Sequence, residues 1–346
     1  MDNRAALGPV ILDLKGHELL KDEHELLRHK QCGGVILFAR NYDNVEQVTR
    51  LTQAIKAVRP ELLIYVDQEG GRVQRMRDGF LNLPPLASLG VLYEREPLAA
   101  IQRAEQLGWL MASECLAVGV DVSFAPVLDL NYENSEVIGD RALHAQADVV
   151  AALARAYVDG MHQAGMAAVG KHYPGHGYVN ADSHHELPID SREYEQIHAM
   201  DLKPFVALVK HGIDGLMPAH IIYEQCAPEP AGFSSFWVQQ ILRMKIGFDG
   251  VVFSDDLTME GAARAGASII DRADAALGAG CDVVLVCNDQ NKAQNALDGL
   301  AEFAMPAASQ RRLNKMRGTG NLTWRDLHNS AAWLECVAAC ERSEIL

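Results

Sequence analysis

Short runs of consecutive apolar residues, most of them rich in β-branched side chains, recur along the chain. The eight runs cover residues 9–14, 33–39, 62–68, 121–130, 167–174, 215–220, 250–256 and 281–288. Hydrophobicity within each run is continuous rather than alternating, as is required of a parallel strand that is covered on both faces. The pattern therefore predicts eight parallel β-strands.

Amphipathic segments with helical spacing separate most of these runs. They cover residues 44–58, 98–118, 145–164, 193–211, 235–245 and 268–279. Asn44 is a candidate N-cap, and Gly165, Gly212 and Gly280 stand where a left-handed C-cap glycine is expected. Alternation of strand and helix predicts an α/β fold, namely a (β/α)8 barrel of the TIM type. An open, doubly wound sheet is the alternative.

The remaining segments are expected to complete a single domain over residues 1–346. Residues 15–31 contain one helical stretch, and residues 84–96 are expected to form a long loop. The barrel core is expected at about residues 9–303, and no linker rich in glycine, serine or proline divides the chain. Residues after Gly318 are expected to form a helical segment that packs against the barrel.

Composition excludes several classes of partner. The chain of 346 residues has 31 basic and 46 acidic side chains and a formal charge of −15, which disfavours nucleic acid as a partner. No apolar run approaches the ~18 residues that cross a membrane. The N-terminus lacks the apolar core of a signal peptide, and the seven cysteines are scattered. We therefore expect a cytoplasmic, monomeric protein.

Polar side chains stand at the ends of seven of the eight predicted strands. They are Asp13, Asp67, Gln68, Glu69, Asp129, Lys171, His172, His220, Asp255, Asp256 and Asn288. The carboxyl ends of barrel strands meet on one face, where barrel enzymes place their catalytic groups. One such residue is readily explained as a buried structural group, but seven converging strand ends predict a functional site.

The loop after the fifth predicted strand carries four histidines between residues 172 and 185. A metal cluster or a solvated polar loop would explain them, but Asp182 and His184 also have the spacing of a hydrogen-bonded pair. A carboxylate bonded to one imidazole nitrogen orients the ring and leaves the other nitrogen free to exchange a proton with substrate. Gly175 and Gly177 would allow this loop to turn sharply over the barrel mouth.

Two further groups of charged residues are candidates for the site. Adjacent residues on a strand point to opposite sides, so only one of Asp255 and Asp256 is expected to face the barrel axis. The alternative is that both cap the following helix.

Three arginines follow the Gly70-Gly71 pair. With Asp67, Arg141 and Lys171, they would supply the donors and acceptors that hold sugar hydroxyls, although Arg77 is more readily explained as a solvated residue. The arginines are Arg72, Arg75 and Arg77.

Six segments of the chain match the sequence motifs of a known family. The segments are VDQEGGRVQR (66–75), SFAPVLD (123–129), KHYPGHG (171–177), DSH (182–184), MPAH (217–220) and FSDDL (253–257). The chain resembles the bacterial β-N-acetylglucosaminidases, or β-hexosaminidases, of glycoside hydrolase family 3. The resemblance implies removal of non-reducing terminal N-acetylglucosamine from peptidoglycan fragments during cell-wall recycling, with retention of configuration. The substrate class is GlcNAc-1,6-anhydro-MurNAc with or without peptide.

The resemblance also implies a role for each matching residue. Asp255 is expected to be the nucleophile, His184 the general acid/base and Asp182 the partner of His184. The expected substrate-binding residues are Asp67, Arg75, Arg141, Lys171 and His172. No metal or other cofactor enters this chemistry, because a carboxylate captures the anomeric carbon and an imidazole moves the proton.

Three other hypotheses remain open from the sequence. In one, the substrate's acetamido oxygen attacks, and Asp255 and Asp256 orient it. In another, a metal-dependent hydrolase uses the same barrel, although residues 11–14 lack the expected His-x-His. The third is a sugar-binding protein without catalytic activity, which would not need the Asp182–His184 pair. The metal ligands of the second would be His172, His176, His184 and His220.

Overall fold

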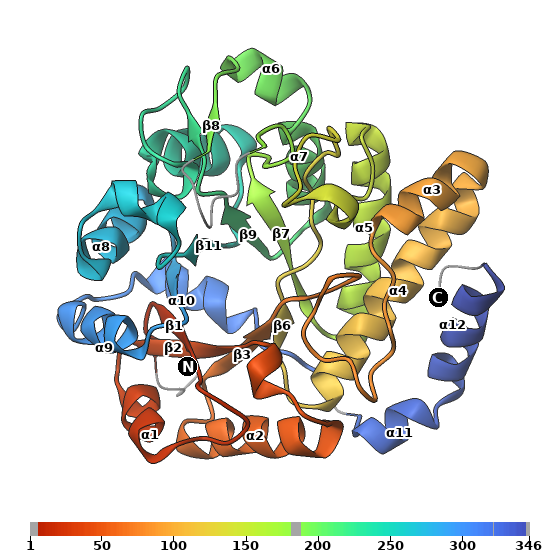
Figure 1. The fold of residues 1–346 in the computed structure, drawn as a ribbon, viewed down its shortest axis with the longest axis horizontal. Helices are drawn as coiled ribbons and strands as arrows, with labels where there is room; N and C mark the ends of the chain where they lie inside the picture. Colours follow the sequence, from red (N-terminus) through yellow and green to blue (C-terminus); the bar gives the residue numbers. More distant parts are fainter. Residues whose placement is uncertain (1–5, 181–187, 321, 344–346) are drawn as a thin grey trace.

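The computed structural model describes residues 6–180, 188–320 and 322–343, and within these ranges eight parallel strands close into a barrel (Figure 1). The barrel strands are β1 (Val10–Asp13), β2 (Cys32–Leu37), β3 (Leu63–Val66), β6 (Val122–Ser123), β7 (Ala167–Tyr173), β9 (Gly215–Pro218), β11 (Val251–Asp256) and β12 (Val283–Val286). Each pairs with the next along the chain, and β12 pairs with β1. The (β/α)8 barrel is confirmed, and the open sheet is wrong because this last pairing closes the ring.

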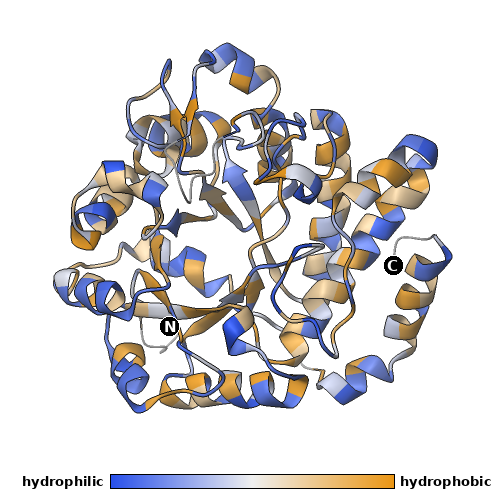
Figure 2. Cartoon of the chain, viewed as in Figure 1, coloured by the Kyte–Doolittle hydropathy of each residue, from blue (hydrophilic) through white to orange (hydrophobic). Residues whose placement is uncertain are grey.

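Helices surround the barrel. They are α1 (Lys21–Arg28), α2 (Val45–Val58), α3 (Ala87–Arg95), α4 (Pro97–Ala117), α5 (Ala147–Ala164), α6 (Tyr194–Ala199), α7 (Leu202–His211), α8 (Ile269–Ala279), α9 (Gln290–Gly299), α10 (Ala307–Asn314), α11 (Trp324–His328) and α12 (Ala331–Arg342). A π-helix, η4 (Phe236–Ile246), stands where residues 235–245 were expected to be helical. In Figure 2 the hydrophobic colours gather on the strands and the hydrophilic ones on the outer turns of the helices.

Alternating side chains of the strands build two separate cores. On β3, Tyr65 points into the barrel and Ile64 points outward toward the helices. Inside the barrel the rings of Tyr65 and Phe124 are stacked with their centroids 5.3 Å apart, and Phe253 meets Phe124 edge-on at 5.3 Å. These large rings fill the barrel interior, so it is a packed core rather than a channel.

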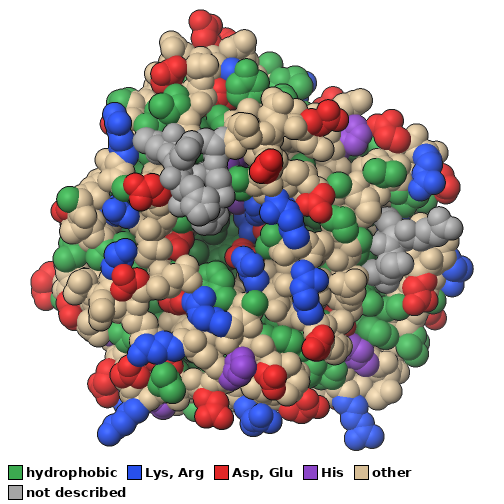
Figure 3. All heavy atoms as spheres, in the orientation of Figure 1, with side chains coloured by type: hydrophobic (Ala, Val, Ile, Leu, Met, Phe, Trp, Pro, Cys, Tyr) green, Lys and Arg blue, Asp and Glu red, His purple; other side chains and the backbone are tan. Residues whose placement is uncertain are grey.

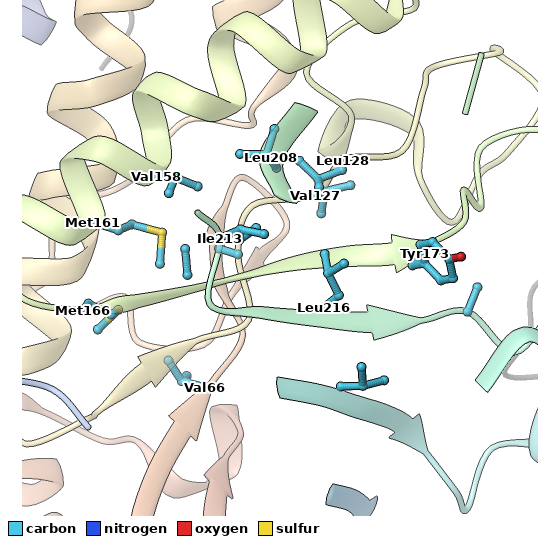
Figure 4. Packing of buried hydrophobic residues seen from close by; sticks show 14 of the residues in the cluster. Val66, Val127, Leu128, Val158, Met161, Met166, Tyr173, Leu208, Ile213 and Leu216 are labelled. Atoms are coloured by element: carbon cyan, nitrogen blue, oxygen red, sulfur yellow. The ribbon is translucent and has the colours of Figure 1, made fainter. Parts of the chain in front are cut away.

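The outer core fills the space between strands and helices (Figure 4). Two helices cover strands β7 and β9 with apolar side chains, namely Val158 and Met161 from α5 and Leu208 from α7. Leu216 of β9 is fully buried beneath them. The segment after residue 318 forms α11 and α12, which lie along α4 (Figure 1).

The prediction of a loop over residues 84–96 is wrong, because the chain forms helix α3 (Ala87–Arg95) there. This helix has only nine residues and follows Pro84 and Pro85, so its sequence carries a weak helical pattern. Leu89 and Leu92 are buried in the outer core, and Gly90 lies against the backbone of Leu143. Tertiary packing, rather than the periodicity of its own sequence, makes this segment helical.

Two other predicted elements are shorter than expected, each because of a proline. The strand predicted at 121–130 is reduced to β6. Pro126 has no N–H to donate and interrupts the ladder, and after it only an isolated bridge between Val127 and Lys171 remains. The helix predicted at 193–211 is divided into α6 and α7. Pro204 cannot donate a hydrogen bond to the carbonyl of Met200, where the backbone leaves the helical conformation. Among the described residues, no helix has the length and apolar character to span a membrane.

Candidate active site

The carboxyl ends of the barrel strands surround a cavity of about 470 Å³. Figure 3 shows a hollow near the centre of this face with Lys and Arg side chains around it. The charged and polar lining residues are Asp67, Glu69, Arg72, Arg75, Glu136, Arg141, Lys171, His172, His176, Asn180, Asp255, Asp256 and Asn288. Every expected sugar-binding residue is in this set, together with Asp255.

Lys171 stands at the centre of a buried charge network on one wall of the cavity. Its Nζ lies 2.8 Å from Oδ1 of Asp67 and 2.6 Å from Oε1 of Glu69. A shift in register between β7 and β9 after Lys171 places both Lys171 and His172 on the cavity wall. Burial lowers the pKa of Lys171, but the carboxylates of Asp67 and Glu69 outweigh this effect and raise it overall, so the ammonium group stays charged.

Two arginines extend this network. Arg141 holds Glu69 through two bonds, Nε to Oε2 at 2.8 Å and Nη2 to Oε1 at 2.9 Å, while Arg75 Nη2 donates to Asp67 Oδ2 at 3.2 Å. Burial raises the pKa of Glu69, yet the charges of Arg141 and Lys171 lower it overall to about 2. The pKa of Asp67 is also held well below its usual range by Lys171 and Arg75, against the effect of burial.

His172 is oriented by a carboxylate behind it. Its Nδ1 lies 2.7 Å from Oδ2 of Asp129. Asp129 is 1% exposed, and its Oδ1 accepts the backbone N–H of His176 at 2.7 Å. Burial raises the pKa of Asp129, but the adjacent His172 holds it below its usual value. Asp129 therefore fixes the ring of His172 and leaves Nε2 as the polar atom toward the cavity. Burial and the charge of His172 lower the pKa of His176 to about 4.

Asp255 and Asp256 both line the cavity but have different surroundings. β11 carries an extra residue relative to β12 between Phe253 and Asp256, a bulge that redirects the side chains there. Asp256 accepts hydrogen bonds from the backbone N–H and hydroxyl of Thr258, at 3.0 and 2.7 Å, and from the N–H of Cys287 at 3.1 Å. Burial raises the pKa of Asp256 to about 6. Asp256 is thus bound into the following loop and to Cys287, whereas Asp255 accepts the backbone N–H of Asp256 on its Oδ1 at 2.8 Å and lines the cavity beside it.

Not every polar strand end reaches this cavity. Gln68 is buried and braces the following hairpin by accepting the N–H groups of Arg75 and Met76. His220 is fully buried, with Nε2 3.1 Å from the carbonyl of Asp256 and its ring stacked on Phe233. These two groups support the fold around the site. Asp13 lines a neighbouring recess instead.

The three arginines after Gly70-Gly71 have different surroundings, as the sequence suggested. Both glycines have positive φ, 102° and 54°, which reverses the chain into the β4–β5 hairpin (Gln68–Gly70 and Val73–Gln74). Arg72 and Arg75 reach the cavity, whereas Arg77 is exposed and donates to the carbonyl of Gly71 at 2.7 Å. Arg77 as a solvated residue is confirmed.

Asp182 and His184 lie outside the described residues. The described residues on either side of them are firmly held. The hydroxyl of Tyr223 donates to the carbonyl of Gly175 at 2.8 Å, and Arg192 pairs with Asp190 at 2.6 Å and Asp201 at 2.8 Å. These contacts hold the described segments that precede and follow residues 181–187.

Sequence reasoning passed over several residues of the cavity. Glu69 was noted only as part of a strand end, although its place in the 66–75 motif was a usable signal. Phe38, Asn180 and Met259 also line the cavity, and they carry no motif that marks them. Within the described residues, no group of three or more His, Cys, Asp or Glu side chains has the arrangement of a metal site.

A closed parallel barrel with charged side chains gathered at the carboxyl ends of its strands has the architecture of a TIM-barrel enzyme. Residues 11–315 match the glycosyl hydrolase family 3 N terminal domain. The chain belongs to glycosyl hydrolase family 3 and is a glycoside hydrolase, as the resemblance implied.

Individual relatives agree with this assignment. The chain is 52% identical over 334 residues to a protein from Thioalkalivibrio sulfidiphilus named beta-hexosaminidase, covering 96% of this chain and 95% of the relative. It is 55% identical over 305 residues to one of the same name from Bordetella avium, covering 88% and 87%. The crystal structure of NagZ from Neisseria gonorrhoeae in complex with N-trifluoroacetyl-D-glucosamine superimposes with a TM-score of 0.91, at 40% identity and 99% coverage of each chain.

Proposed function

We propose that this glycoside hydrolase is a retaining β-N-acetylglucosaminidase that removes non-reducing terminal N-acetylglucosamine from peptidoglycan fragments. The observation that carries the proposal is Asp255, a carboxylate at the end of β11 in a cavity whose opposite wall is the Asp67–Lys171–Glu69 network. The relatives named beta-hexosaminidase, and the NagZ structure in complex with N-trifluoroacetyl-D-glucosamine, support N-acetylglucosamine as the sugar. The substrate would be GlcNAc-1,6-anhydro-MurNAc, with or without peptide, in cell-wall recycling.

The chemistry is a double displacement. The Asp255 carboxylate attacks the anomeric carbon and forms a glycosyl ester, while His184, oriented by Asp182, gives its proton to the departing glycosidic oxygen. In the second step His184 takes a proton from water, the water oxygen bonds to the anomeric carbon, and the ester bond to Asp255 breaks. Both steps use side chains of this chain and require no metal or cofactor.

The sugar would be held by the charged wall opposite the nucleophile. Lys171, Arg75 and Arg141 offer N–H donors, and Asp67 offers carboxylate acceptors to hydroxyl groups. Their mutual ion pairs keep them charged and fixed before substrate arrives, so little ordering remains to be done on binding. His172, fixed by Asp129, would add a ring nitrogen to the same sugar.

The surroundings of Asp256 favour this mechanism over attack by the substrate's acetamido oxygen. That alternative needs a second carboxylate to orient the acetamido group. Asp256 already accepts three hydrogen bonds from Thr258 and Cys287, so its oxygens are engaged by the fold. A nucleophilic Asp255 needs no such partner.

We place the reaction in the cytoplasm and expect the protein to act as a monomer. All seven cysteines lie within the described residues as free thiols, which suits a reducing compartment. The net charge of −15 further suits a small glycan rather than a polyanion as partner.

Hydrolysis of GlcNAc-1,6-anhydro-MurNAc in the presence of EDTA tests the proposal. Free N-acetylglucosamine should be released at the same rate with and without the chelator, because both reacting groups are side chains. Chromatography of the products gives the rate. Absence of cleavage would overturn the substrate assignment, and activity that EDTA abolishes and zinc restores would favour the metal-dependent hydrolase.

A further inference from the structure

One oxygen of the proposed nucleophile is bonded to the main chain of the residue that follows it. Oδ1 of Asp255 accepts the backbone N–H of Asp256 at 2.8 Å. Because a hydrogen bond weakens as it departs from linearity, this bond restricts rotation of the carboxylate about its Cβ–Cγ bond. A carboxylate that attacks an anomeric carbon must be aligned with that carbon before the reaction begins. The alignment of Asp255 therefore depends on where the main chain holds the N–H of Asp256.

The ladder between β11 and β12 does not by itself hold this N–H group. β11 carries an extra residue relative to β12 between Phe253 and Asp256. Beyond it, the N–H of Leu257 continues the ladder by donating to the carbonyl of Leu285 at 2.9 Å, whereas the N–H of Asp256 donates to Asp255. Since a bulge disrupts the ladder locally, other contacts must fix the main chain at Asp256.

The side chain of Asp256 provides such contacts. Its Oδ1 accepts the backbone N–H groups of Thr258 at 3.0 Å and of Cys287 at 3.1 Å, and its Oδ2 accepts the hydroxyl of Thr258 at 2.7 Å. Cys287 directly follows β12, so the carboxylate ties the end of β11 to the neighbouring strand and to its own loop. Burial raises the pKa of Asp256 to about 6, and the donors of Thr258 and Cys287 oppose that rise, so the group is mostly ionised at pH 7. An ionised carboxylate only accepts hydrogen bonds, which suits a site with three donors.

The carbonyl of Asp256 is held as well. It accepts the N–H of Met259 at 3.2 Å, and Nε2 of His220 lies 3.1 Å from it. His220 follows β9 and is fully buried, with its ring stacked on Phe233, so this contact belongs to the packed interior. Contacts from the segment after β9, from the end of β12 and from its own loop therefore hold the main chain of Asp256 in one position.

We propose that Asp256 and Thr258 are positioning residues for the nucleophile. The hydroxyl of Thr258 holds the carboxylate of Asp256, that carboxylate holds the main chain, and the main-chain N–H orients Asp255. The inference rests on the proposed function, because it requires that Asp255 attacks the sugar. It gives Asp256 neither the attack nor a bond to the substrate, and Thr258 lies outside the described lining of the cavity.

Two substitutions weaken this series of contacts by different amounts. Asp256→Asn keeps the size of the side chain but replaces one accepting oxygen with an amide nitrogen that cannot accept. Thr258→Val removes only the hydroxyl that donates to Asp256. Thr52→Val is the matched control, because the hydroxyl of Thr52 in α2 donates to the carbonyl of Val118, outside the described lining of the cavity.

Hydrolysis of an aryl β-N-acetylglucosaminide and competitive inhibition by N-acetylglucosamine separate positioning from sugar binding. kcat/KM should fall by about 100-fold for Asp256→Asn and by about tenfold for Thr258→Val, since small displacements of a reacting group slow the reaction strongly. The inhibition constant of N-acetylglucosamine should stay within about twofold of the wild-type value, because the free sugar binds without being attacked by Asp255. Thr52→Val should lose thermal stability as Thr258→Val does, yet keep the wild-type kcat/KM.

Each other outcome would overturn the inference. Wild-type kcat/KM in Thr258→Val would show that Asp255 needs no such support, and this variant decides the claim even if Asp256→Asn does not fold. An inhibition constant that rises in step with the loss of kcat/KM would assign Asp256 to sugar binding. An equal loss of kcat/KM in Thr52→Val would show general destabilisation. A wild type that cleaves no aryl β-N-acetylglucosaminide would contradict the proposed function itself, whereas an active wild type with unaffected variants would contradict the positioning alone.

Discussion

Glu69 shows how strongly the charges of this site depend on one another. Its carboxylate is 2% exposed, and its oxygens are shared between Arg141 and Lys171 at 2.6–2.9 Å. A buried ion of this kind is tolerated only with its partners in place, since a lone buried charge costs several kcal/mol. The network is therefore a condition for the fold around β7, and it forms one wall of the cavity.

Glu69→Gln tests this dependence. Removal of the charge leaves Arg141 and Lys171 buried with one carboxylate fewer, so the free energy of unfolding at pH 7 should fall by about 3 kcal/mol. The folded pKa of about 2 lies below the value of about 4.3 in the unfolded chain, so ionised Glu69 stabilises the fold above pH ~4.3, and this contribution is lost as the pH falls toward 2. Urea unfolding at several pH values should show the two proteins converge in acid, and a constant difference would contradict this account.

His184→Ala tests the proposed acid/base. Without a proton donor, substrates with poor leaving groups should lose about 10²–10⁴-fold in kcat, while activated aryl substrates should lose far less. Steady-state kinetics on a series of aryl leaving groups gives the contrast, with His185→Ala as the matched control. Equal losses for all leaving groups would assign His184 to binding instead.

At the scale of elements, the close approach of α4 and α5 depends on two glycines. A Cβ at Gly108 would lie 2.1 Å from the carbonyl oxygen of Tyr157, and one at Gly160 would lie 1.9 Å from that of Glu105. Each helix thus presents a glycine to the backbone of the other. No pattern in the sequence marks these positions, because the requirement comes from the partner helix.

Gly160→Ala and Gly278→Ala form a matched pair that tests this packing. Alanine favours a helix interior by roughly 0.5–1 kcal/mol over glycine, and Gly278 in α8 is exposed with no described atom within 4 Å of a Cβ. Gly278→Ala should therefore stabilise the protein, while Gly160→Ala should destabilise it by about 1–3 kcal/mol through overpacking. Thermal unfolding measures both, and stabilisation by Gly160→Ala would contradict the close contact.

At the scale of the whole molecule, the sequence predicted the barrel because parallel strands buried on both faces have a distinctive continuous pattern. Polar residues at the strand ends predicted the face that holds the site. The sequence could not predict which strand ends share a cavity. Asp67 and Lys171 meet across the barrel mouth, whereas Asp13 and His220 do not reach it, and strand length and register decide the difference. Helix α3 was missed for a similar reason, because tertiary packing holds it.

The identity of the nucleophile is the central claim, and trapping of the glycosyl-enzyme tests it most directly. A slowly turned over fluorinated N-acetylglucosamine substrate, followed by peptic digestion and mass spectrometry, should place one sugar on the peptide segment 251–256 and on Asp255 within it. Asp255→Asn should fold with unchanged thermal stability, because the amide is nearly isosteric, and should take no label and lose nearly all turnover. A label on Asp256, or an unlabelled protein that still cleaves natural substrate, would contradict the assignment of Asp255.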